Sequence, residues 1–410
     1  MNILQINKFF YVKGGAARYF IELSKLLKNQ GHNIVYFSTI EKKIHRKNLN
    51  KWDENFINYL SINDISLNNI HYYLARLFFS QKCNQRMSEI IKNYKINLVH
   101  IHNIYHQIPP SIIRECKKNN LPVIFTIHDY HLISVNNHMF HNGKICEITK
   151  PNKFYKGIFH KCQKDSFFYS LIEVLEKYFN LIIPWERKLV DIYITPSKFM
   201  QDKLIEYGIP SEKVRFLSHF VNYHEYKPVY KDGYYVLYFG RLSAEKGLDF
   251  LINTVSRRPE IKLKIAGTGS EEKRLRDLVS NKKIKNVQFL GFKSGNELKK
   301  IIQECKFTIL PSFWNEVFGL SILESFASGK PVLASDIGGI PEIIENGYNG
   351  FLFKPGDGNN LLNQLDRLWK DTSLCRKLGV QARQTVEKKY GPEKHYRNLM
   401  KIYNDAIKIN

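Results

Sequence analysis

Two glutamates in the second half of the chain could bind the hydroxyl groups of a sugar nucleotide. Glu316 and Glu324 are separated by seven residues and follow a hydrophobic run at 307–310 that predicts a buried strand. At a strand end, each carboxylate could hold two neighbouring hydroxyls, one pair on a sugar and one on a ribose. The alternative interpretation is an ordinary pair of solvated glutamates.

The residues between these glutamates predict a site for phosphate. Phe318 and Gly319 indicate a turn, and residues 320–328, beginning at Leu320, have a helical pattern. A helix that starts at the end of a strand presents unpaired N–H groups and a partial positive charge. This arrangement suits the diphosphate of a nucleotide.

A basic segment follows the first predicted strand of the second half. Gly240 begins it, and Arg241 and Lys246 are expected to project from the strand-end loop, where two cations could stabilise a departing pyrophosphate. A basic surface loop is the alternative in a chain so rich in lysine. Gly267 lies in a later strand-to-helix turn, but Glu272 stands where a dinucleotide fingerprint would have its third glycine.

Glycines and histidines supply the candidates of the first half. Gly14 and Gly15 follow the first predicted strand and open a helix, so a phosphate or sugar could approach the backbone closely, although a plain turn is the alternative. His128 follows another predicted strand and could face a bound sugar. His100 and His102 also end a strand, and their chemistry alone does not separate the three histidines from one another or from structural ones.

The candidate residues follow predicted strands, so they can form one site only in a fold that places the ends of these strands close together. Short β-branched runs alternate with helical patterns, which is typical of α/β domains with parallel sheets whose ligands bind at the carboxyl ends of the strands. The predicted strands cover 2–6, 33–38, 98–102, 123–127, 191–195, 214–217, 234–239, 262–266, 286–290, 307–310, 331–334 and 350–353. Helices are predicted at 17–30, 72–94, 109–119 and 392–409.

The chain has 410 residues, which suggests two domains. We predict one domain over 1–222 and a second over 223–390, beginning with a linker rich in Pro, Tyr and Lys at 222–233. The final helix, within 391–410, is expected to pack back on the first domain.

The second half resembles the retaining glycosyltransferases of family 4. The resemblance rests on Glu316 and Glu324 in their Phe-Gly-Leu-Ser-Ile-Leu-Glu context and on Gly-Arg-Leu-Ser-Ala-Glu-Lys-Gly from Gly240. The segments 329–332, 338–342 and 346–351 extend it. It implies the GT-B fold, in which two Rossmann-like, doubly wound parallel-sheet domains face a central cleft. It also implies a hexosyltransferase that moves a sugar from a nucleotide-diphosphate donor to a hydroxyl acceptor with retention of configuration.

The resemblance also implies a role for each matching residue. Arg241 and Lys246 would stabilise the departing diphosphate, Glu316 would hold hydroxyls of the transferred sugar, and Glu324 would hold the ribose. The Thr-Ile-His-Asp context favours His128 as the histidine near the anomeric centre. The glycine turn at Gly267 would lie beside the base and the Gly14 loop over the phosphates, with front-face attack and no dedicated nucleophile.

No metal or other cofactor is expected in the reaction. The sequence has no Asp-x-Asp, the motif with which GT-A glycosyltransferases hold a metal ion, so the two cations and the helix N-terminus would replace it. Separately from the reaction, Cys146, His160 and Cys162 are residue types that could bind a structural metal ion. Family relatives often carry a further cysteine where this chain has Ile148 and Thr149, so an incidental pair of thiols is the alternative.

The charge of the chain implies an anionic partner. Lysine and arginine total 62 against 38 acidic residues, so the net charge is +24. A UDP- or GDP-linked sugar accounts for only a few of these cations. The basic aromatic segment 150–169 could make peripheral contact with an anionic membrane, where a glycan or polyprenyl-phosphate-linked acceptor would bind. The alternatives for this segment are stacking on single-stranded nucleic acid and a solvated lysine face.

The cysteines and the N-terminal sequence bear on where the protein is located. Six scattered cysteines and the lack of a signal-peptide pattern predict a cytoplasmic protein, at the inner face of the cytoplasmic membrane if it binds lipid. The expected product is a bacterial surface polysaccharide such as capsule, lipopolysaccharide or exopolysaccharide. The rival functions are a nucleotide-sugar 2-epimerase of the same architecture and a nucleic-acid-binding protein, although no specific nucleic acid is expected.

Overall fold

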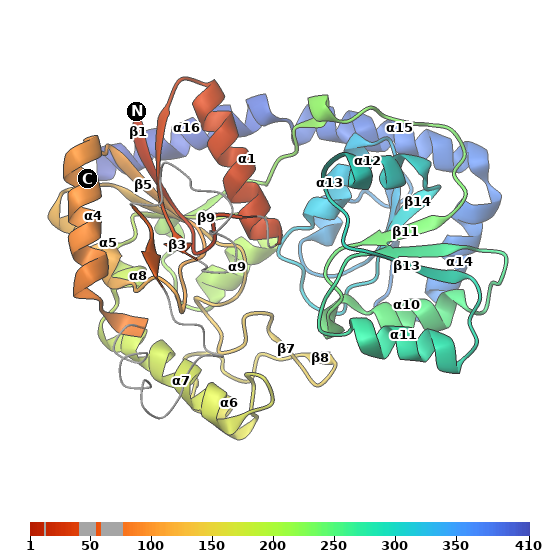
Figure 1. The fold of residues 1–410 in the computed structure, drawn as a ribbon, viewed down its shortest axis with the longest axis horizontal. Coiled ribbons are helices and arrows are strands. Elements are labelled where there is room, and N and C mark those ends of the chain that lie inside the picture. Colours follow the sequence, from red (N-terminus) through yellow and green to blue (C-terminus); the bar gives the residue numbers. More distant parts are fainter. Residues whose placement is uncertain (12–13, 41–54, 59–76) are drawn as a thin grey trace.

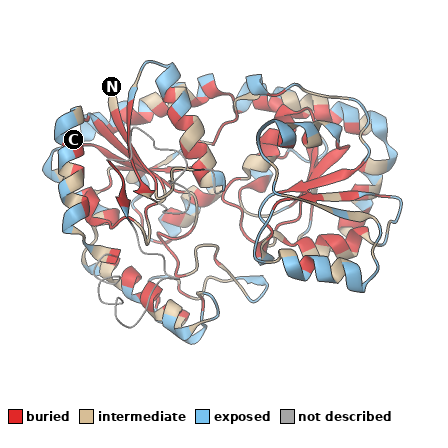
Figure 2. Cartoon of the chain, viewed as in Figure 1, coloured by how far each residue is buried: buried red, intermediate tan, exposed pale blue. Residues whose placement is uncertain are grey.

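The chain folds into two lobes, each built on a six-stranded parallel sheet between layers of helices (Figure 1). The structure, a computed structural model, describes residues 1–11, 14–40, 55–58 and 77–410. Strand interiors are buried in both lobes, whereas the outward helix faces are exposed (Figure 2). Sheets covered on both faces explain why the strands are nearly continuous hydrophobic runs.

The sheet of the first lobe has the order β10-β9-β6-β5-β1-β2. Its strands are β1 (Asn2–Ile6), β2 (Asn33–Phe37), β5 (Leu98–Ile101), β6 (Val123–Thr126), β9 (Ile192–Thr195) and β10 (Val214–Phe216). Its helices are α1 (Gly15–Asn29), α4 (Gln81–Tyr94), α5 (Ser111–Lys118), α6 (Lys156–Phe159), α7 (Phe167–Ile182), α8 (Trp185–Leu189) and α9 (Lys198–Glu206). Two small pairs accompany them: β3 (Thr39–Ile40) with β4 (Ile57–Asn58), and β7 (Phe140–His141) with β8 (Lys144–Ile145).

The sheet of the second lobe has the order β13-β12-β11-β14-β15-β16. Its strands are β11 (Val236–Phe239), β12 (Leu263–Ala266), β13 (Val287–Gly291), β14 (Phe307–Leu310), β15 (Val332–Ser335) and β16 (Gly350–Phe353). Its helices are α10 (Leu248–Val255), α11 (Glu272–Asn281), α12 (Gly295–Glu304), α13 (Leu320–Ala327), α14 (Gly358–Lys370) and α15 (Thr372–Lys389). The 3₁₀ turns are η3 (Ser211–Lys213), η4 (Tyr223–Glu225), η5 (Ala244–Lys246) and η6 (Ile340–Glu342).

The strand predictions are confirmed, with ends shifted by at most two residues. The helix predicted over 72–94 is confirmed at residues 77–78 and over α4, but it is interrupted at Phe79 and Ser80, and α4 begins at Gln81. The hydroxyl of Ser80 accepts the amide hydrogen of Cys83 at 3.3 Å, and this cap starts a new helix. Residues 72–76 of that prediction lie outside the described residues.

The last helix returns the chain to the first lobe. α16 (Pro392–Ile409) begins with a proline, whose missing N–H is not needed in a first turn. Its residues Leu399, Ile402 and Tyr403 belong to the hydrophobic core around the first sheet. In Figure 1 this helix lies beside α1. None of the helices in the described part of the chain has the length and hydrophobicity needed to cross a bilayer.

Each sheet reverses its strand order at one point, and these points position the site. In the first sheet the reversal lies between β1 and β5, and in the second between β11 and β14. The crevice outside the carboxyl ends of strands at such a point is where open α/β sheets bind ligands. The loops after β11 and β14 contain the predicted residues Arg241, Lys246 and Glu316.

Candidate active site

The centre of the site is an ion pair between two of the predicted residues. Lys246 Nζ lies 2.6 Å from Glu316 Oε1, which also accepts a hydrogen bond from the Ser312 hydroxyl. The ammonium stands 5.1 Å from the centre of the Trp314 ring. Burial acts to raise the pKa of Glu316, but the attraction of Lys246 and these hydrogen bonds outweigh it and lower the pKa. The carboxylate is therefore ionised at neutral pH and can accept sugar hydroxyls.

The loop that contains Glu316 also touches the other lobe. The Tyr130 hydroxyl donates to the carbonyl of Asn315 at 2.8 Å, and the Ser197 hydroxyl donates to the carbonyl of Val317 at 2.7 Å. Both donors come from the first lobe. Glu316 therefore stands between the lobes, where a donor on one sheet and an acceptor on the other would meet.

Arg241, the second predicted cation, lies nearer the rim. Its Nη2 is 3.0 Å from Glu245 Oε1 and 3.0 Å from His138 Nε2. Glu245 is buried and also accepts a 2.6 Å hydrogen bond from Ser243. Because the Arg241 side chain is 53% exposed, its remaining N–H groups can reach an incoming anion. His138 comes from the first lobe, so Arg241 also bridges the cleft.

Glu324 lies at a second meeting point of the lobes. Arg18 on α1 approaches its Oε1 at 2.5 Å, and the Tyr226 hydroxyl donates to the same oxygen at 3.2 Å. Burial raises the pKa of Glu324, and Arg18 offsets this only in part. These side chains line a cavity of about 40 Å³. That volume holds a few water molecules, so a ribose could bind here only if the Arg18 side chain moved.

At two of the predicted glycines, the backbone lies close to another segment of the chain. Gly15, at the start of α1, faces the start of α13, since a Cβ on it would stand 3.6 Å from Leu320 Cδ1. Gly319 precedes α13 with a φ of 114°, a conformation that favours glycine. In the second lobe, a Cβ on Gly267 would lie 1.8 Å from the carbonyl oxygen of Gly240. Gly14 is different, because its φ of 172° is extended and its Cβ position is open.

The three strand-end histidines lie in one stack, and exposure distinguishes them. His100 and His102 are completely buried, whereas His128 is half-buried. His102 Nδ1 and His128 Nε2 lie 3.1 Å apart, and burial lowers the pKa of His128 to about 4. The His128 ring is 5.2 Å from the ring of His219, which is 5.2 Å from that of Phe318. Of the three histidines, His128 is therefore the one that is partly exposed and that connects, through the His219 ring, to Phe318 of the second lobe.

Several residues of this arrangement were not among the sequence predictions. They are Arg18, His138, His219, Tyr226, Glu245 and Ser312. One of them carried a signal, because a cation at Arg18 in the first turn of a helix opposes the helix dipole.

Cys146 and Cys162 lie close enough for their thiols to hydrogen bond, which lowers the pKa of Cys146 to about 6. Within the described residues, they and His160 do not form a three-ligand metal cluster.

Residues 13–385 of the chain match two glycosyltransferase family models. Glycosyltransferase Family 4 matches residues 13–225, and Glycosyl transferases group 1 matches residues 222–385. The N-acetyl-alpha-D-glucosaminyl L-malate synthase of Bacillus anthracis is 26% identical over 398 residues, which cover 96% of this chain and 95% of that protein. The amylovoran biosynthesis glycosyltransferase AmsK of Erwinia amylovora is 27% identical over 226 residues, 52% of this chain and 56% of AmsK.

Solved structures share the two-lobed fold. Sucrose-phosphate synthase from Thermosynechococcus elongatus has a TM-score of 0.75 at 17% identity, with 100% of both chains covered. HepE of Anabaena, in complex with UDP and glucose, has a TM-score of 0.71 at 17% identity and covers 99% of this chain and 100% of HepE. The expected GT-B fold is thereby confirmed. Since a family model spans more than half of its residues, the chain belongs to glycosyltransferase family 4 and is a glycosyltransferase.

Proposed function

We propose that this glycosyltransferase moves a hexose from a nucleoside-diphosphate donor to a hydroxyl acceptor with retention of configuration. The observation that supports this most is the buried Lys246–Glu316 pair at the strand-order reversal of the second sheet. It places a cation for the leaving group beside a carboxylate for the sugar. The helix N-terminus at Leu320 adds unpaired N–H groups in the same loop region.

The proposed reaction uses charges that the protein already holds. Lys246, Arg241 and the start of α13 stabilise the departing diphosphate as negative charge develops on it. Glu316 accepts hydroxyls of the transferred sugar, and Glu324 accepts those of the ribose once Arg18 moves away. His128 is neutral and lines the face where the acceptor hydroxyl approaches. The acceptor oxygen attacks from the leaving-group side, its proton passes to the departing phosphate, and no bound metal takes part.

Binding to nucleotide sugars tests the donor. We expect a UDP- or GDP-sugar to raise the melting temperature by several degrees at about 100 times its Kd, a stabilisation of about 2.7 kcal/mol, and ADP- and CMP-sugars to leave it unchanged. The complex of the structural relative HepE with UDP and glucose supports UDP. A thermal-shift screen of the four donor classes measures this. A chain stabilised by none of them would contradict a nucleotide-sugar donor.

The products distinguish transfer from epimerisation. Incubation with the stabilising donor and a lipid-linked or free glycan is expected to release the nucleoside diphosphate and form an α-linked product from an α-linked donor, read by NMR. Turnover is expected to persist in EDTA. An isomerised sugar nucleotide without transfer would instead identify a 2-epimerase, and an inverted linkage would rule out retention.

Surface polysaccharide synthesis at a membrane is the proposed setting. The relative AmsK, named for amylovoran biosynthesis, supports the pathway. The segment around α6 and α7 lies at the edge of the first lobe (Figure 1) and exposes aromatic rings among lysines. Phe159 is 76% exposed and Phe167 55%, with exposed Lys161 and Lys164 between them. Rings and cations together suit the headgroup region of an anionic bilayer.

Vesicle binding tests this surface. We expect the protein to sediment with phosphatidylglycerol vesicles and not with pure phosphatidylcholine, and Phe159→Ser with Phe167→Ser to weaken binding at least about tenfold, since each ring buries apolar area in lipid. Phe292→Ser is the matched control, because Phe292 is 63% exposed on the second lobe. Equal binding by the double variant and the control would contradict a membrane role for this segment.

A further inference from the structure

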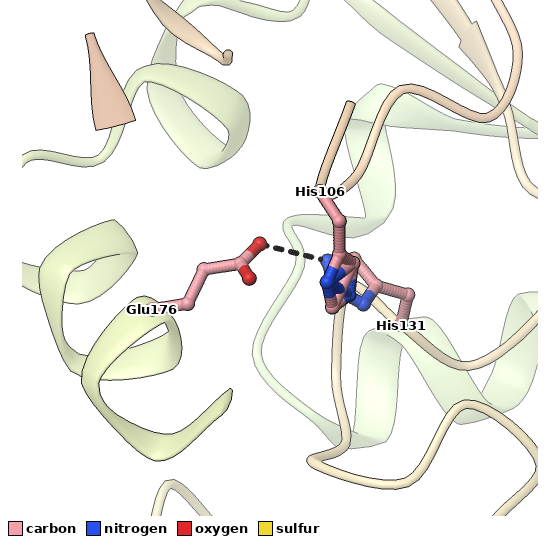
Figure 3. Close-up of side chains that lie close together, drawn as sticks. All are labelled: His106, His131 and Glu176. Atoms are coloured by element: carbon pink, nitrogen blue, oxygen red, sulfur yellow. Dashed lines mark hydrogen bonds and ion pairs between the residues drawn. The ribbon is translucent and has the colours of Figure 1, made fainter. Parts of the chain in front are cut away.

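Three metal-ligand side chains meet inside the first lobe. His106 follows β5, His131 follows β6 and Glu176 lies on α7, so the cluster joins three separate segments (Figure 3). Each offers one ligand atom, and these atoms all lie within 4.8 Å of one another. Neither sugar nor diphosphate binding, as proposed above, uses any of them.

The carboxylates around this cluster have unused acceptor atoms. Glu176 Oε1 lies 3.1 Å from His131 Nε2, and Glu173 Oε1 lies 3.0 Å from His106 Nε2. The second oxygen of each carboxylate is buried and has no hydrogen-bond partner among the described residues. Glu173 is 0% exposed and Glu176 3%. Buried polar atoms without partners are costly, and a cation is one way to satisfy them.

We propose that His106, His131 and Glu176, with Glu173 as a fourth ligand, bind a divalent transition-metal ion, for which zinc has the best-matching ligand chemistry. Two imidazole nitrogens and two carboxylate oxygens are ligands that zinc takes in four-coordinate sites. Each imidazole offers one ring nitrogen as a ligand atom. Ligands about 2.1 Å from a zinc ion stand about 3.4 Å apart, so binding draws His106, His131 and Glu176 inward by about 1 Å.

The role of this ion is structural. It would tie α7 to the loops after β5 and β6, and the second of these loops also contains His128. The reaction proposed above does not depend on it, because the diphosphate is met by Arg241 and Lys246. Loss of the ion therefore lowers stability and leaves donor binding in place.

Lys177 is a native cation at the cluster. Lys177 Nζ is 3.1 Å from His131 Nε2 and donates a hydrogen bond to the His131 carbonyl. Its ammonium compensates the carboxylates in the metal-free protein and must move when the ion binds. The Lys177 ammonium therefore competes with the metal ion for the same site, and removing its charge should strengthen metal binding.

Calorimetric titration of the EDTA-treated full chain with zinc chloride tests the site. The background is Cys146→Ser, because the neighbouring thiols of Cys146 and Cys162 could bind zinc themselves. We expect one saturable site and a raised melting temperature. Lys177→Met should bind at least about tenfold tighter, since a cation within 4 Å of the ion repels it by more than 1.4 kcal/mol. Glu173→Gln should bind about 10–100-fold more weakly.

The histidine variants complete the test. His106→Gln and His131→Gln should lose the site and the visible absorption of bound cobalt, whereas the exposed His224→Gln should keep both. Circular dichroism shows whether each variant is folded, and the shift in melting temperature on UDP-sugar binding should be unchanged, which separates this test from that of the proposed function. The inference is overturned if the parent chain shows no saturable binding, even where Lys177→Met binds, or if binding survives both histidine substitutions.

Discussion

Replacing Lys246 by alanine is expected to lower turnover at least about 100-fold, because one preorganised charge contact to a leaving group contributes that much to a rate. The loss has a second cause in the geometry. Without the ammonium 2.6 Å away, the buried Glu316 carboxylate loses its main counter-charge, and its pKa rises. Initial rates at saturating donor, with circular dichroism to confirm folding, measure the effect.

Glu316→Gln should cause a loss of similar size, and the double variant should be little worse than either single one. Two partners in one ion pair give non-additive effects, because removing the first already abolishes the interaction. Lys293→Ala is the control, since Lys293 pairs with the exposed Glu297 on the surface of the same lobe and such pairs contribute little. Near-parental turnover in a folded Lys246→Ala or Glu316→Gln variant would remove that residue from the site.

Gly267→Ala is expected to destabilise the second lobe by about 3 kcal/mol or more and to abolish donor binding. Gly267 has a φ of 146°, and an added Cβ would stand 1.8 Å from the carbonyl oxygen of Gly240. Because that atom belongs to the backbone, the clash is relieved only by moving the loop that begins the Arg241 segment. Urea unfolding and the thermal shift with a UDP-sugar measure the two effects.

Gly356→Ala isolates the contribution of backbone conformation. Gly356 lies in the same lobe with a φ of 79°, but nothing stands within 4 Å of its Cβ position. Its cost should be about 1 kcal/mol, with donor binding retained. If Gly267→Ala cost no more than Gly356→Ala, the close contact between the two glycine loops would not be a feature of the folded protein.

Local signals in the sequence predicted most of the framework. Hydrophobic runs located all twelve strands of the two large sheets, and the turn at Gly319 located the start of α13. Such signals are local, because buried strands and helix starts depend on residues within about one turn or strand. The helix predicted over 72–94 shows the limit, since the structure interrupts it at Phe79 and Ser80, where the Ser80 side chain caps the start of α4.

The partners of the site residues needed the tertiary structure. Arg18 and Glu324 are 306 positions apart in the chain, and His138 and Arg241 are 103 apart, yet each pair bridges the two lobes. Strand order and lobe packing decide which distant residues meet, and neither has a periodic signature in the sequence. The sequence by itself thus determined the elements, the family and the two glutamates. Only the tertiary structure decided which cation meets each carboxylate, how the three strand-end histidines differ in exposure, and that two histidines and two glutamates meet inside the first lobe.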